Sequence, residues 1–153
     1  MKVYEYKAEQ LLPTNIDKAW AFFSSPRNLS VITPPSLDFK ILSDFNDEEI
    51  YSGMLINYTV KPLFGIPVNW QTEITDVIKP HSFTDRQLKG PYKMWEHKHY
   101  FIEKKNGVLA IDHIHYALPF GLLGILAHAL VVRRKLDDIF NFRSTTLDKI
   151  FPA

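Results

Sequence analysis

The stretch that decides the fold runs from residue 12 to residue 29 and reads Leu12-Pro13-Thr14-Asn15-Ile16-Asp17-Lys18-Ala19-Trp20-Ala21-Phe22-Phe23-Ser24-Ser25-Pro26-Arg27-Asn28-Leu29. Its first proline stops a strand predicted over residues 2–12, and Thr14 or Asn15 can cap a helix over residues 16–24. The second proline ends that helix, because a residue before proline avoids helical backbone angles. The stretch therefore predicts a strand and a short helix, with one further helical turn over residues 27–32.

The region that follows, residues 37–118, is typical of successive antiparallel strands, because apolar side chains recur at every second position. Turn-forming residues separate these runs: Asn46-Asp47, Pro62 with Gly65, Lys79-Pro80, Gly90-Pro91 and Asn106-Gly107. From about residue 122 the apolar spacing changes to three and four residues, which predicts a long packed helix. Its stripe is Leu126, Ala129, Leu130, Leu136, Ile139, Phe140, Leu147 and Ile150.

This order of elements predicts an α+β fold. A curved antiparallel sheet of about six to seven strands wraps around the long C-terminal helix, and two short helices follow the first strand. The basic run Arg133-Arg134-Lys135, together with Arg143, is interpreted as a solvated helix face, because Asp137 and Asp138 lie within helical reach.

The composition is that of one folded domain spanning residues 1–153, with 46% hydrophobic and 23% charged residues. A net charge of +1 argues against a nucleic-acid-binding surface, and the lack of cysteine excludes disulfides and thiolate metal sites. The N-terminus lacks the apolar core of a signal peptide, and no apolar run approaches the ~18 residues of a membrane span. We therefore expect a cytoplasmic protein without stable membrane insertion.

The element order and several local sequences resemble the START-like or Bet v 1-like (SRPBCC) superfamily, in its bacterial ligand-binding or polyketide cyclase/dehydratase-like branch. Besides residues 12–29, the resemblance rests on Ile32-Thr33-Pro34-Pro35, Gly90-Pro91-Tyr92, Trp95-x-His97-x-His99-x-Phe101 and Tyr116-Ala117-Leu118-Pro119-Phe120-Gly121. It implies a helix-grip fold with a deep cavity between the sheet and the terminal helix. Members bind or transform unrelated small molecules, so the resemblance does not fix a function.

Four histidines form two His-x-His pairs, His97 with His99 and His113 with His115. Residues two apart in a strand point to the same face, so the register between the two strands decides whether the four imidazoles meet. A three-residue loop would bring the pairs together at a metal site. The favoured register, derived next, places the second pair outside, and neither a metal nor a cofactor is expected.

The register follows from Asn106-Gly107, which predicts a two-residue type I′ loop in which Lys105 pairs with Val108. On this register Asp112 is the diagonal neighbour of His99, about 7–8 Å away between backbones. The inward face then carries Trp95, His97, His99, Phe101, Asp112, Ile114, Tyr116 and Leu118.

Two interpretations of these inward polar residues stay open. One is a buried network in which Asp112 accepts a hydrogen bond from an imidazole. The other is an acid–base pair, with His99 and Asp112 as the candidate catalytic residues. The candidate ligand-binding residues are Trp95, His97, His99, Phe101, Asp112, Tyr116, Trp70, Tyr58, Asp85 and Gln87. The sequence leaves open whether Asp85 and Gln87 point inward.

These features favour a binding module that holds a small hydrophobic or aromatic molecule in an internal cavity, for transport or sequestration. One alternative is a polyketide cyclase/dehydratase-like enzyme that uses the His99–Asp112 pair. Another, implied only by the resemblance, is an accessory lipid- or quinone-binding interaction domain. The sequence specifies neither the ligand nor the oligomeric state, and it leaves open whether a reaction is catalysed.

Overall fold

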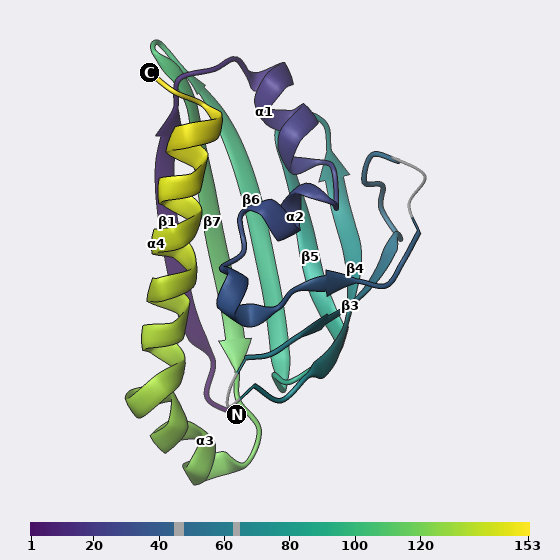
Figure 1. The fold of residues 1–153 in the computed structure, drawn as a ribbon, viewed down its shortest axis with the longest axis vertical. Helices are drawn as coiled ribbons and strands as arrows, with labels where there is room; N and C mark the ends of the chain where they lie inside the picture. The colour runs from purple at the N-terminus through teal and green to yellow at the C-terminus, as the bar shows by residue number, and fades with distance from the viewer. Residues whose placement is uncertain (45–47, 63–64) are drawn as a thin grey trace.

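A seven-stranded antiparallel sheet forms the body of the fold, as shown by a computed structural model that describes residues 1–44, 48–62 and 65–153 (Figure 1). The strands are β1 (Tyr4–Leu12), β2 (Lys40–Ile41), β3 (Leu55–Val60), β4 (Val68–Ile78), β5 (Ser82–Lys89), β6 (Met94–Lys104) and β7 (Gly107–Ala117). Their order in the sheet is β1-β7-β6-β5-β4-β3-β2, so the first strand pairs with the last. The predicted turn at Asn46-Asp47 lies outside the described residues.

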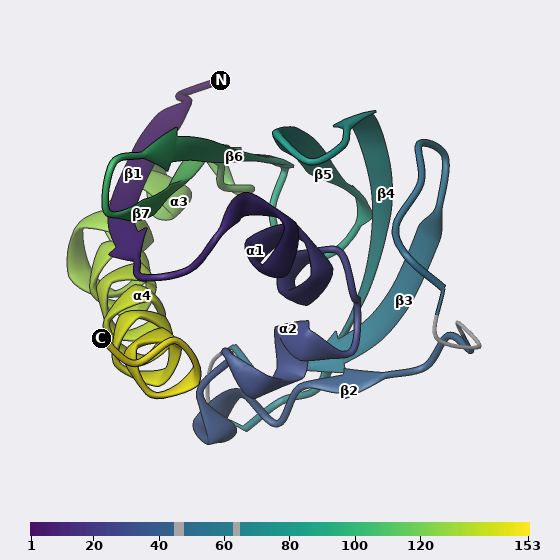
Figure 2. The same cartoon turned by 90° about the horizontal axis from the view of Figure 1, so that it is seen from above.

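The helices lie on the concave side of this curled sheet (Figure 2). After β1 come α1 (Ile16–Phe23), α2 (Asn28–Val31) and the 3₁₀ turn η1 (Pro35–Leu37), and the chain closes with α3 (Gly121–Ala127), the π-helical turn η2 (His128–Val132) and α4 (Arg133–Ile150). Asn15 caps α1 as predicted, because its side chain accepts a hydrogen bond from the Lys18 backbone N–H at 2.9 Å. The predicted α+β, helix-grip architecture is confirmed.

Buried aromatic rings connect α1 to the sheet. Trp20 is almost fully buried, and it meets Phe83 of β5 and Phe101 of β6 edge-on at ring-centroid distances of 5.9 and 6.0 Å. A second group of buried residues lies under α4, where Leu136 packs with Ile114 and Tyr116 of β7. The core thus occupies both ends of the concave face.

The hairpin between β6 and β7 has a different register from the one predicted. Lys104 pairs with Gly107 and the turn consists of Lys105 and Asn106, so every β6 residue meets a partner two positions earlier in β7. Gly107 is therefore the first residue of β7 and not part of the turn. A glycine is required there because β1 packs closely, and an added Cβ would lie 2.2 Å from the Leu12 carbonyl oxygen. A shift of two residues keeps each side chain on its face, so the predicted inward face is confirmed.

The predicted apolar stripe of the terminal helix is wrong in its first part. Leu126 and Leu130 are exposed, whereas Leu136 and Leu147 are buried. The difference arises because α3 extends beyond the ends of the neighbouring strands, so that of its residues only Gly124 is buried (Figure 1). Among the described helices, none combines the length and the apolar composition needed to cross a bilayer.

Candidate functional site

A cavity of about 210 Å³ opens between the concave face of the sheet, α2 and α4. Four aromatic side chains of its wall contact one another: Tyr58 of β3, Trp70 of β4, Tyr92 between β5 and β6, and Trp95 of β6. Trp70 lies at the centre, with ring-centroid distances of 5.7 Å to Tyr58, 5.5 Å to Tyr92 and 5.4 Å to Trp95. This side of the cavity therefore offers broad apolar faces to a ligand.

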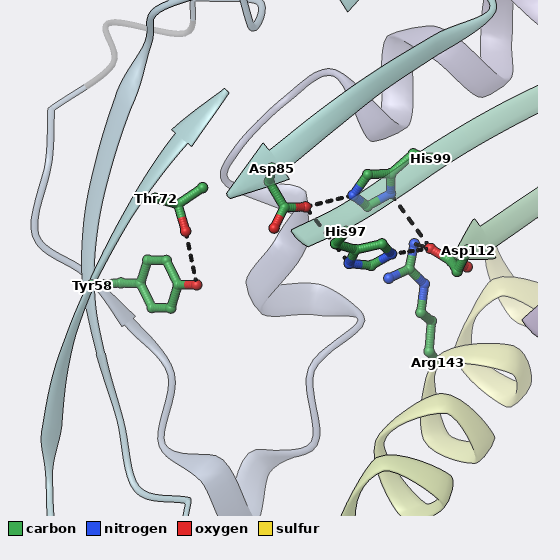
Figure 3. A network of polar contacts seen from close by, with 7 residues as sticks. All are labelled: Tyr58, Thr72, Asp85, His97, His99, Asp112 and Arg143. Atoms are coloured by element: carbon green, nitrogen blue, oxygen red, sulfur yellow. Dashed lines mark hydrogen bonds and ion pairs between the residues drawn. The ribbon is translucent and has the colours of Figure 1, made fainter. Parts of the chain in front are cut away.

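The opposite side of the cavity carries a polar cluster of five residues, drawn in Figure 3. Sheet pairing brings four of them together, because Asp85 of β5 lies opposite His97 of β6, and His99 of β6 lies opposite Asp112 of β7. Arg143 approaches the same carboxylate from α4. Three neighbouring strands and the terminal helix therefore all contribute to one cluster.

The two imidazoles lie between two carboxylates. Asp112 Oδ1 accepts a hydrogen bond from His97 Nε2 at 2.7 Å and lies 3.4 Å from His99 Nδ1. Asp85 Oδ2 accepts from His99 Nε2 at 2.6 Å and lies 3.6 Å from His97 Nδ1. The rings stack with centroids 3.7 Å apart, so each histidine directs one nitrogen to each carboxylate.

The pKa values of the two imidazoles are shifted in opposite directions. Burial lowers the pKa of His97, and the charge of His99 lowers it further. Burial also acts to lower the pKa of His99, but hydrogen bonds to Asp112 and Asp85 outweigh it and raise the pKa above its ordinary value. These contacts favour the imidazolium form of His99, and in that form His99 and Arg143 face the two carboxylates.

The carboxyl groups are held ionised by the same contacts. Burial by itself would raise the pKa of Asp112, but the Arg143 guanidinium at 3.1 Å and the two imidazoles hold it well below its usual range. For Asp85, burial is outweighed by His97 and by the hydrogen bond from His99, so its pKa is also lowered. The cluster can therefore both accept and donate hydrogen bonds at the cavity wall.

Two groups in the described part of the chain have a spacing that a metal ion could bridge. Asp85, His97 and His99 form one group, and Glu5, His113 and His115 form the other on the outer face, with the ligand atoms of each group within 4.8 Å of one another. The four histidines do not meet, because the two pairs point to opposite faces of the sheet. In the cavity group, His99 Nε2 is hydrogen-bonded to Asp85 at 2.6 Å, whereas the buried His99 Nδ1 has no hydrogen-bond partner among the described residues.

Six of the candidate ligand-binding residues line the cavity, namely Trp95, His97, His99, Trp70, Tyr58 and Asp85. The other four support that wall or lie elsewhere. Asp112 lies behind the imidazoles, Phe101 packs against Trp20 in the core, and the Tyr116 hydroxyl shares a 2.7 Å hydrogen bond with His128.

Gln87 does not line the cavity, but it contacts Tyr92, which does. Its side chain donates to the Tyr92 carbonyl at 2.7 Å and accepts from the Tyr92 N–H at 3.1 Å. This pair of hydrogen bonds holds the Tyr92 ring against the cavity. The sequence left open whether Asp85 and Gln87 point inward. In the structure Asp85 lies in the cavity wall, and Gln87 positions Tyr92, which is a wall residue.

Arg143 is the main functional residue that the sequence interpretation misplaced. It was expected on a solvated face, but it is buried and lines the cavity. Its position in the sequence indicated burial, because Arg143 is seven residues after Leu136 and four before Leu147, and both leucines belong to the apolar stripe. Tyr92 was also missed, although it follows the turn at Gly90-Pro91.

Comparisons with solved structures agree with this architecture. The chain is 17% identical to protein Ms6760 from Mycobacterium smegmatis over 98% of both chains, with a TM-score of 0.66. It is 13% identical to ginseng major latex-like protein 151 from Panax ginseng over 99% of both chains, with a TM-score of 0.70. A nucleoside-diphosphate sugar epimerase from Corynebacterium glutamicum, 17% identical, matches 94% of this chain with 28% of its own, at a TM-score of 0.66.

These similarities establish the fold, in agreement with the predicted helix-grip architecture. No family model matches the sequence, and no curated protein matches it. The function is therefore argued from the site.

Proposed function

We propose that this protein binds one small, largely apolar or aromatic molecule that carries a single polar group. The cavity supports the proposal, because its mostly apolar wall contains one compact polar cluster, as is usual in ligand pockets. An apolar cavity of about 150 Å³ holds benzene. A volume of about 210 Å³ therefore suits a molecule of one or two rings.

The polar cluster favours a hydroxyl or carboxyl group on that molecule. The Arg143 guanidinium, which has more N–H groups than its contact with Asp112 uses, presents donors at the cavity wall, and the Asp85 carboxylate presents an acceptor there. On the aromatic side, the Tyr58 and Thr72 hydroxyls lie 3.3 Å apart and add a second polar point. Burying ~200 Å² of apolar ligand surface contributes about 5 kcal/mol before the costs of association, so these polar contacts decide which molecule binds.

The test compares ring compounds with and without a polar group. Benzene, naphthalene and their hydroxyl and carboxyl derivatives are added to the purified protein, and the melting temperature is measured. We expect the polar derivatives to raise it more than the parent hydrocarbons do. Ile56→Phe fills the cavity and should abolish the shift, whereas Ile102→Phe, on the exposed face of β6, should retain it. No shift with any compound, or an equal shift in the Ile56→Phe protein, would contradict the proposal.

A second candidate function is general acid–base catalysis, favoured by the position of His99. This residue lines the cavity, its pKa is raised, and its direct hydrogen-bond partner is Asp85. A protonated imidazole at that wall can donate a proton to a bound carbonyl compound. Native mass spectrometry of protein from its own host would identify a copurified molecule. Incubating that molecule with the parent and His99→Gln proteins would then show by NMR whether His99 is needed to change it.

A further inference from the structure

Five large apolar side chains project from the start of the terminal helix, and we call them the apolar tip: Phe120, Leu122, Leu123, Leu126 and Leu130. Leu122 is 84% exposed and Phe120 is 81% exposed, more than any other large hydrophobic residue in the described part of the chain. Single exposed leucines are ordinary, but several on one short segment indicate a contact surface. Figure 1 shows that α3 extends beyond the ends of the neighbouring strands.

The local backbone fixes this exposure. Phe120 and Gly121 both have positive φ angles, of 70° and 53°, so the chain turns sharply into α3. Gly124 is buried against the preceding segment, and an added Cβ there would lie 2.2 Å from the Pro119 carbonyl oxygen. Because Gly124 faces inward, Leu122 and Leu123 on the same short helix face outward.

The charges that follow the apolar tip along the chain are positive up to Lys135, although Arg133 also lies 3.9 Å from Asp137. No acidic residue occurs between residues 113 and 136, and the exposed run Arg133-Arg134-Lys135 follows the tip directly. Lys2 lies at the same end of the molecule, because its ammonium group is 5.0 Å from the Tyr4 ring, which stacks on His128 at 3.6 Å. Apolar side chains bordered by cations match the chemistry of an anionic lipid surface.

We propose that the apolar tip docks on an anionic lipid surface. Phe120 and the leucines enter the boundary between headgroups and acyl chains, while the neighbouring cations contact lipid phosphates. A second copy of the chain is a poorer occupant, because two apposed tips would bring their Arg133-Arg134-Lys135 runs together. Docking brings the cavity near the lipid, since Tyr92 of its wall contacts Tyr116, which is hydrogen-bonded to His128.

The test measures co-sedimentation of the full chain with phosphatidylcholine vesicles, with and without phosphatidylserine. We expect binding to the anionic vesicles, weaker binding at high salt, and a loss of about tenfold or more in Leu122→Ser/Leu123→Ser. Ile66→Ser/Ile78→Ser removes two exposed aliphatic side chains elsewhere and should bind like the parent protein. Circular dichroism checks that both double variants are folded.

A direct readout uses Phe120→Trp, whose emission should shift to shorter wavelength with anionic vesicles and not with neutral ones. The proposal is overturned if the parent protein binds neither kind of vesicle, or if the Leu122→Ser/Leu123→Ser protein binds as well as the parent. It is also overturned if light scattering shows a dimer that only this variant loses, because the tip would then be a contact between copies. None of these outcomes depends on whether the cavity binds a ligand.

Discussion

Arg143 of α4 lies 3.1 Å from Asp112 of β7, and this ion pair joins the terminal helix to the sheet behind the two imidazoles. Both side chains are largely buried, and the guanidinium also lies 5.5 Å from the Phe140 ring centroid. A buried pair of this kind makes each partner costly to remove alone, because the other charge is then left without compensation.

Replacing Arg143 tests this linkage. Arg143→Met should lower the free energy of unfolding by about 3–5 kcal/mol, because it leaves the Asp112 carboxylate buried without its cation. Adding Asp112→Asn should recover part of that loss. Arg86→Met breaks a 2.6 Å pair with Glu73 at the surface and should cost less than about 1 kcal/mol. Urea denaturation measures these variants, the parent protein and Asp112→Asn alone, and additive effects of the Arg143 and Asp112 changes would contradict the linkage.

The stabilising effect of His99 should depend on pH. Its pKa is raised in the folded protein, so its contribution is fully present below the unfolded value of ~6.5 and is lost as pH rises through the folded value. The difference in unfolding free energy between the parent protein and His99→Gln should therefore shrink from pH 5.5 to pH 8.5. A difference that grows over this range would refute the assigned direction.

Removing Asp85 should change the titration of His99. Asp85→Asn takes away a hydrogen-bond acceptor that favours the imidazolium, so the pKa of His99 should fall. NMR of the imidazole Cε1–H signal measures the midpoint directly. Glu73→Gln, which removes a surface carboxylate from β4, is the matched control and should leave the midpoint where it is. An unchanged midpoint in Asp85→Asn would assign the pKa shift to Asp112 alone.

Two glycines should respond differently to alanine. Gly107→Ala should destabilise the protein strongly, because the new Cβ would lie 2.2 Å from the Leu12 backbone oxygen and the residue has a φ of 154°. Gly90→Ala meets the end of the Gln87 side chain at 2.4 Å, and this side chain can move. Thermal unfolding should therefore show a larger drop for Gly107→Ala. A larger drop for Gly90→Ala would mean that the hydrogen bonds of Gln87 matter more than the β1 contact.

The helices and strands could be predicted from the sequence because each depends on residues that are close together in the chain. The cap at Asn15 and the two-residue alternation of the strands depend only on neighbouring positions. The faces of His97 and His99 followed from the same alternation, which a register shift of two does not change.

The errors arose where distant segments decide the outcome. The β6–β7 register depends on the approach of Leu12 to Gly107, which no turn pattern reveals. The direct pairing of His99 with Asp112 follows from that register, and so does much of the polar cluster. Arg143 was predicted to be exposed to solvent because it is charged, although its position in the apolar stripe of the helix indicated burial.

The pairing of opposite charges in the polar cluster has a consequence for how molecules enter the cavity. While His99 is protonated, two carboxylates beside one imidazolium and one guanidinium produce almost no field at a distance, so they attract neither anions nor cations from bulk solution. Encounter then depends on diffusion and shape, and added electrolyte should hardly alter the rate of uptake into the interior.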